Sequence, residues 1–128
     1  MWKKIRVSHQ FEELSKKVIR AAIAVHKELG PGFLESIYEE ALKVELNNNG
    51  VSSFSQKEIR IEYSGVVVGI HRLDLVVEDQ IIVELKAVKE LADIHFAQVR
   101  SYLKATGLKI GLLLNFSKPT LEIRRIVN

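Results

Sequence analysis

The chain of 128 residues contains no cysteine. This absence excludes structural disulfides, zinc sites built from thiolates and iron–sulfur clusters, and it fits an intracellular protein. The sequence also lacks internal repeats, low-complexity segments and a convincing linker between domains. We therefore expect residues 1–128 to form a single domain, which is long enough to bury a conventional hydrophobic core.

Long apolar runs are absent as well. Residues 1–6 carry charge but have no hydrophobic stretch behind them, so the sequence predicts neither a signal peptide nor a membrane span. A cytoplasmic location is the resulting expectation. The net charge of +3 is compatible with a polyanionic partner, but it falls short of the dense basic stripe that marks a dedicated nucleic-acid binder.

Helical periodicity dominates the first part of the chain. Apolar side chains recur on one helical face over residues 8–29, and the Gly30-Pro31-Gly32 sequence ends this helix. A second amphipathic helix is expected over residues 33–47. Its inward side chains are predicted to be Leu34, Ile37, Ala41 and Val44, and a neighbouring face carries Glu35, Tyr38, Glu39 and Leu42.

After Gly50 the pattern changes to alternation with many β-branched residues. This pattern predicts three strands in a meander, over residues 56–63, 66–77 and 81–87. Ser64-Gly65 suits a two-residue hairpin connection, and Gly69 is a candidate for a β-bulge.

The second hairpin connection decides which side chains share a face of the sheet. A three-residue loop pairs Val77 with Ile81 and places Asp74 opposite Glu84. A two-residue loop would instead oppose Asp74 to Leu85 and send the two carboxylates to different faces. We predict the three-residue loop or a compensating bulge.

The last third of the chain reads as a helix followed by two strands. Asp93 is the predicted N-cap of a helix over residues 93–105, and a buried strand over 109–115 precedes an edge strand over 121–127. The strand–helix–strand crossover is expected to be parallel. The complete order predicts an α/β three-layer fold, with a mixed sheet of about five strands flanked by helices.

Asp74 and the triplet Glu84-Leu85-Lys86 are the candidate chemical site. Glu84 and Lys86 are two apart on a strand, so they point to one face. Two carboxylates and the Leu85 carbonyl form a plausible partial shell for Mg²⁺, with Mn²⁺ as a substitute ion. Such an ion acidifies water and neutralises phosphate charge, while Lys86 would orient the water.

Helical side chains supply further candidates. Gln98 and Tyr102 are four apart on one helix and able to reach the same substrate. Glu35 could add a carboxylate from the second helix, although Glu39 and Glu40 are rivals. The competing interpretation is ordinary surface chemistry: a half-exposed sheet face with a Glu84–Lys86 ion pair, and solvated helix faces.

Gly32, Glu35 and Tyr38 match a G-x-x-E-x-x-Y signature, and over residues 11–127 the chain resembles the GxxExxY protein family. That family resembles a compact branch of the PD-(D/E)XK nuclease superfamily. Further matching blocks are residues 72–75, 83–87, 98–102, 111–116 and 125–127.

This resemblance implies a restriction-endonuclease-like core. By the same similarity, Asp74 and Glu84 correspond to metal ligands, Lys86 to the catalytic lysine and Glu35 to the helix acid of such sites. Gln98-x-x-x-Tyr102 resembles the motif of RecB-like exonucleases. Leu73 stands where the literal Pro-Asp pair has proline, a difference of little chemical consequence.

The leading functional hypothesis is therefore a Mg²⁺-dependent phosphodiesterase, a nuclease acting on nucleic acid, with DNA slightly favoured over RNA. The alternative is a noncatalytic module that keeps the nuclease fold and binds nucleic acid or protein. A subunit that needs a partner, and a homodimer formed through an edge strand, are also left open.

Overall fold

The computed structural model describes residues 9–128, without the side chains of His9 and Gln10. Residues 1–6, on which the expectation of no signal peptide rests, and the predicted helix start at Ser8 lie outside this part. Within the described residues, no helix is long and apolar enough to cross a membrane.

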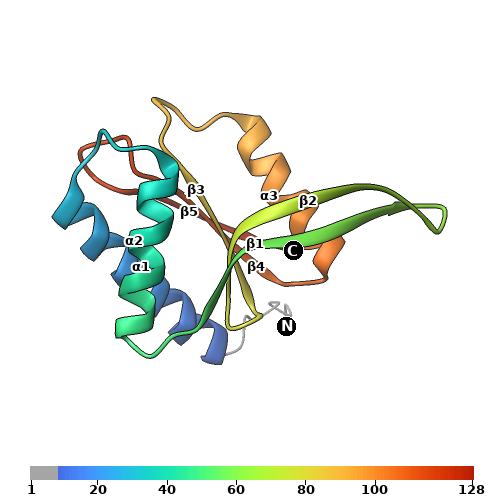
Figure 1. Cartoon of the computed structure of the whole chain (residues 1–128), viewed down its shortest axis with the longest axis horizontal. Helices are drawn as coiled ribbons and strands as arrows, with labels where there is room; N and C mark the ends of the chain where they lie inside the picture. The colour runs from blue at the N-terminus through green and yellow to red at the C-terminus, as the bar shows by residue number, and fades with distance from the viewer. Residues whose placement is uncertain (1–8) are drawn as a thin grey trace, which may run out of the picture.

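A five-stranded mixed sheet in the order β1-β2-β3-β4-β5 forms the middle layer. Only β3 and β4 pair in parallel, as the predicted crossover requires. Helices α1 and α2 lie on one side and α3 on the other (Figure 1), which confirms the three-layer α/β fold. The elements are α1 (His9–Leu29), α2 (Glu35–Asn48), β1 (Ser53–Tyr63), β2 (Val66–Val77), β3 (Ile81–Lys86), α3 (Asp93–Thr106), β4 (Ile110–Asn115) and β5 (Glu122–Val127).

The sheet separates two hydrophobic clusters. Leu75, Leu85 and Leu112 belong to the cluster that packs on α1 and α2. Ile82 and Leu113 belong to the cluster on the α3 side. All six residues of β4 are buried, because this strand has strands on both edges and helices over both faces.

The buried face of α2 differs from the prediction. Tyr38, Leu42 and Leu46 are fully buried, whereas Leu34, Ile37 and Val44 are exposed. Both stripes have helical spacing, so periodicity alone allows either face. Packing decides between them, since the Tyr38 ring stacks on Phe116 with ring centroids 4.4 Å apart. The predicted inward stripe of α2 is therefore wrong at Leu34, Ile37 and Val44, whereas Ala41 is partly buried against the cluster.

The strand registers follow the parity prediction. Val77 pairs with Ile81 across the three residues 78–80, and Tyr63 pairs with Val66 across Ser64-Gly65. The register of the first hairpin shifts between Ile61 and Glu62, next to Gly69, as expected for a bulge there. β1 begins at Ser53, which is earlier than predicted.

The start of α3 also differs in detail. Ala92 occupies the N-cap position, and Asp93 lies in the first turn without a side-chain cap bond. Instead, the backbone N–H of Ala92 donates to Nδ1 of His95 at 2.9 Å. The helix ends at Gly107, whose φ of 76° suits a residue without Cβ. His95 thus caps α3.

Much of the β1–β2 hairpin projects beyond the sheet, as Figure 1 shows. β2 pairs with β3 only from Leu75 to Val77. The earlier residues of β2 pair with β1 alone. Within residues 9–128, the far part of this hairpin consequently has no strand along either of its edges.

Candidate metal and catalytic site

Asp74 and Glu84 lie where the pairing of β2 with β3 ends, directly after the pair Leu75–Val83. The backbone N–H of Asp74 donates to Oε2 of Glu84 at 3.3 Å. The backbone N–H of Leu85 donates to Oδ2 of Asp74 at 3.0 Å. Beyond the pair Leu75–Val83, these bonds from backbone N–H groups to carboxylates replace the backbone hydrogen bonds between the two strands. The two carboxyl groups are therefore held next to each other.

Burial gives Glu84 an unusual electrostatic state. Its side chain is buried, and this burial, followed by a shared hydrogen bond with Asp74 and the charge of Asp74, raises the pKa of Glu84 to about 9. The positive charge of Lys86 acts in the opposite direction but does not offset the burial. A divalent cation would supply the positive charge that this pair of acids lacks.

Tyr102 brings a hydroxyl group from α3 towards the same acids. Burial, and then the negative charges of Glu84 and Asp74, raise the pKa of Tyr102 to about 12. The phenol therefore keeps its proton at neutral pH. Its ring stacks on His71 of β2, with centroids 4.3 Å apart. His71 was not assigned a role from the sequence, because a lone histidine on a strand carries no specific signal.

Glu35 is the helix acid that approaches the end of β3. Its Oε2 accepts a hydrogen bond from the backbone N–H of Ala87 at 3.2 Å. Its rivals are engaged elsewhere, since Glu39 accepts bonds from Ser55 and Gln56 and Glu40 pairs with Lys43. A hollow of about 520 Å³ is lined by Phe33, Leu34, Glu35, Ser36, Glu39, Asp74 and Ala87.

Tyr38 explains how Glu35 is positioned. The Tyr38 hydroxyl accepts a hydrogen bond from the backbone N–H of Phe33 at 3.1 Å and donates one to the carbonyl of Gly30. These bonds close the turn that precedes α2, and the stacking of Tyr38 on Phe116 ties that turn to the end of β4. The Gly-x-x-Glu-x-x-Tyr pattern thus fixes the start of the helix that carries Glu35.

Lys86 and Gln98 are less constrained by polar contacts than the acids and Tyr38. Both side chains are half-buried, and neither forms an ion pair or a side-chain hydrogen bond within residues 9–128. Lys86 shares a face of β3 with Glu84 and is close enough to affect its pKa. Gln98 lies one turn before Tyr102 on α3.

The donor set fits a hard cation that keeps much of its water. No group of three or more His, Asp or Glu side chains suited to a metal is gathered among the described residues. Two adjacent carboxylates and the nearby main chain of β3 remain. Mg²⁺ is commonly held in this way, by one or two carboxylates with several waters.

Asn115 is a site residue that sequence reasoning missed. It lies opposite Lys86 in the β3–β4 register and is fully buried. Its side chain accepts from the backbone N–H of Val88 at 3.1 Å and donates to the Val88 carbonyl at 2.8 Å. Asn115 therefore fixes the segment that follows Lys86. The available signal was a polar residue at the end of an apolar strand.

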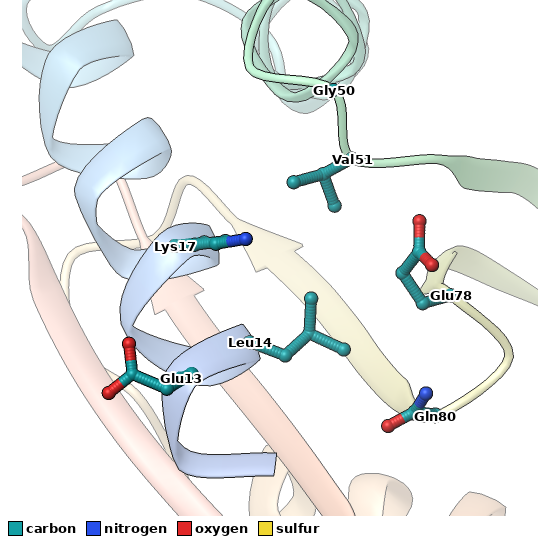
Figure 2. Close-up of a pocket in the computed structure, with 7 residues that line it drawn as sticks. All are labelled: Glu13, Leu14, Lys17, Gly50, Val51, Glu78 and Gln80. Carbon is teal, nitrogen blue, oxygen red and sulfur yellow. The ribbon is translucent and has the colours of Figure 1, made fainter. Parts of the chain in front are cut away.

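A second hollow, of about 580 Å³, lies at the opposite end of β3 (Figure 2). Lys17 of α1 extends towards it, and Glu78 on its wall is bonded to the backbone and hydroxyl of Ser52. None of the predicted site residues is among its lining residues, which are Glu13, Leu14, Lys17, Gly50, Val51, Glu78 and Gln80.

Comparison with known proteins assigns the class. Residues 12–126 match the sequence signature of the PD-(D/E)XK nuclease superfamily, and the chain belongs to this superfamily. Its members generally use divalent metal ions. No curated protein matches the chain.

Among solved structures, the crystal structure of SSO0001 has a similar fold. The TM-score is 0.56 at 17% sequence identity, and the match covers 93% of this chain and 60% of that one. The chain thus spans about 60% of the length of that protein. At this identity the similarity concerns the fold alone.

Proposed function

We propose that the protein is a Mg²⁺-dependent phosphodiesterase of the nuclease type, acting on nucleic acid with DNA favoured over RNA. The observation that carries this proposal is the buried carboxyl of Glu84, held against Asp74 on the face of β3 that also carries Lys86. The superfamily membership agrees with it.

The two acids are the proposed metal ligands. Oδ2 of Asp74 accepts a hydrogen bond from the backbone N–H of Leu85, and Oε2 of Glu84 accepts one from the backbone N–H of Asp74. On binding of a cation, the two carboxyl groups would lose the proton that they share and would then hold the cation with their remaining oxygens. The Leu85 carbonyl is the proposed third ligand. When bound, Mg²⁺ would acidify a water molecule and neutralise charge on a scissile phosphate.

The remaining residues handle the water and the substrate. Lys86 is the proposed catalytic lysine, since its ammonium group, which makes no ion pair with the described carboxylates, can donate to a water or a phosphate oxygen beside Glu84. Tyr102, which stays protonated, donates a hydrogen bond towards the substrate. Glu35 holds the backbone at Ala87, and Gln98 supports the substrate from the preceding turn of α3.

We further propose that the chain is a GxxExxY-type member of the superfamily. The contacts of Tyr38 with the Gly30 turn and of Glu35 with Ala87 support this subdivision. The tyrosine of the signature closes the turn before α2, and the glutamate holds the backbone that follows β3.

The test is cleavage of labelled single- and double-stranded DNA and RNA in the presence of Mg²⁺ or Mn²⁺. Asp74→Asn and Lys86→Ala should each lower the rate by about a hundredfold or more, whereas Lys89→Ala, which removes an exposed lysine nearby, should leave it unchanged. Equal rates in all four proteins would reject the proposed site. A noncatalytic binding module would bind nucleic acid without cleaving it.

A further inference from the structure

The exposed part of strand β1 carries an apolar stripe. Ile59, Ile61 and Tyr63 alternate along the strand and share the face of the sheet that looks towards α3. Ile59 is buried in the α3-side cluster, whereas Ile61 is 37% and Tyr63 74% exposed. The stripe therefore extends the hydrophobic cluster outwards, along a strand at the edge of the sheet.

The opposite face of the same strand carries two charges that have no partner in the described part of the chain. Glu58 forms an ion pair with Arg72 of β2 at 3.1 Å. Arg60, however, lies opposite Ile70, and Glu62 lies opposite Val67. Neither forms an ion pair or a side-chain hydrogen bond with any described residue from 9 to 128. A positive and a negative charge thus stand two positions apart on an unpaired edge.

We propose that β1 pairs antiparallel with β1 of a second copy of this chain, with Ile61 opposite the partner's Ile61 on the twofold axis. An edge strand with free backbone groups and exposed apolar side chains is a ready template for such pairing. A twofold interface brings the same surface of both copies together, so the strand must be complementary to itself.

The register follows from this self-complementarity. Directly opposed residues point to the same face of a sheet, whereas neighbours along a strand point to opposite faces. The twofold axis must therefore pass through one residue, which then lies opposite its own copy, and not between two residues. Centring on Arg60 sets Glu58 against the partner's Glu62, which repel. Centring on Ile59 sets Lys57 against the partner's Ile61. It also opposes Arg60 to the partner's Glu58, but Glu58 is already engaged by Arg72 of its own chain. Centring on Ile61 pairs Arg60 with the partner's Glu62 on one face and Ile59 with the partner's Tyr63 on the other, each twice.

Pairing of this kind joins the two sheets into one continuous sheet. The axis is perpendicular to that sheet, so the α3 helices of both copies lie on the same face. The stripes of Ile59, Ile61 and Tyr63 then cover each other, which removes their exposed apolar surface from water. This interface does not depend on the proposed chemistry.

Cysteine cross-linking tests the register, since the chain has no cysteine of its own. Ile61→Cys should form a disulfide-linked dimer under mild oxidation, because the two cysteines would face each other across the axis. Tyr63→Cys should not, because the two positions would be about 13 Å apart along the strands. Tyr63 is the more exposed residue, so faster cross-linking through Tyr63→Cys would indicate random collision and overturn the proposal.

Charge exchange tests the interface without a covalent bond. Arg60→Glu or Glu62→Arg alone should weaken dimerisation by about tenfold or more in sedimentation analysis, and the double exchange should restore it. The matched control exchanges Glu58 and Arg72, which pair within one chain, and should leave dimerisation unchanged. A wild type that remains monomeric up to about 100 µM, or a double exchange without recovery, would overturn the proposal.

Discussion

Glu84 makes the stability of the protein depend on pH. Burial raises the pKa of Glu84 from 4.5 to about 9, so the folded state holds this proton more strongly than the unfolded state. The contribution of the group to stability is complete below about pH 4.5 and is lost as pH rises towards 9.

The first prediction follows for Glu84→Gln, which cannot ionise. This variant should be more stable than the wild type at about pH 9, and its advantage should shrink as the pH is lowered towards 4.5. Urea denaturation in metal-free buffer at several pH values measures the difference. Glu12→Gln, an exposed change in the first turn of α1, should show no such trend. A constant advantage of Glu84→Gln at every pH would contradict the proposed cause.

The second prediction concerns metal removal. Mg²⁺ should raise the melting temperature of the wild type, and a chelator should reverse this, because an ion that binds only the folded state stabilises it. Glu84→Gln should abolish the effect. Glu39→Gln changes an acid that lines the hollow beside Asp74 but is engaged by Ser55 and Gln56, and it should retain the effect. An equal Mg²⁺ response in both variants would argue against the two-carboxylate site.

Among single residues, the sequence predicted the neighbourhood of Asp74 and Glu84 because strand parity has a strict period of two. It could not predict the contacts that depend on distant segments. The stacking of His71 on Tyr102 and the bonds of Asn115 to Val88 join elements that only the folded chain brings together.

At the scale of elements, a glycine in β4, Gly111, allows α3 to pack closely on the sheet. A Cβ atom at Gly111 would lie 2.5 Å from Cγ1 of Val99 on α3. The short distance allows the helix, and with it Tyr102, to lie close to the sheet. A side chain at this position would have to displace the helix or force Val99 out of its rotamer, since valine in a helix has one strongly preferred χ1.

The third prediction tests this close packing of α3 against Gly111. Gly111→Ala should lower the free energy of unfolding by about 1–3 kcal/mol, as measured by urea denaturation. Gly69→Ala is the matched control on another strand, where an added Cβ meets nothing within 4 Å. Combining Gly111→Ala with Val99→Ala should cost less than the sum of the two single changes. Simple additivity would show that the close contact is unimportant.

Element boundaries were predicted well where a strong signal marks them, as at Ser64-Gly65 and at Gly30-Pro31-Gly32, before which α1 ends at Leu29. The buried face of α2 was not, because two apolar stripes of equal spacing compete. The choice is made by Phe116, which lies far away in the sequence and stacks on Tyr38. Local periodicity has no access to such a contact.

At the scale of the whole molecule, the order of helices and strands was enough to predict the three-layer fold, because few topologies satisfy one parallel crossover within a meander. The projection of the first hairpin was not predicted. Its strands have the lengths and the alternation of interior strands. The sequence does not show that the pairing between β2 and β3 ends at Leu75 of β2.

The fourth prediction removes the projecting part. Replacing residues 61–69 by Asn-Gly would connect Arg60 and Ile70, which already face each other. Residues 61–69 belong to neither hydrophobic cluster. The free energy of unfolding of the shortened chain should therefore lie within about 1 kcal/mol of that of Arg60→Glu, the full-length variant with weakened dimerisation. The shortened chain should also sediment as a monomer. Failure to fold would show that the hairpin tip stabilises the domain.

Asp74 has a structural duty in this chain that does not depend on cleavage of a substrate. Its carboxylate accepts a hydrogen bond from the N–H of Leu85 where β2 and β3 separate, so a residue without a side-chain acceptor would leave this backbone donor unpaired. Selection for folding alone would therefore preserve this aspartate. Lys86 has no such bond within residues 9–128. The lysine is consequently the better marker of retained catalysis when relatives of this protein are compared.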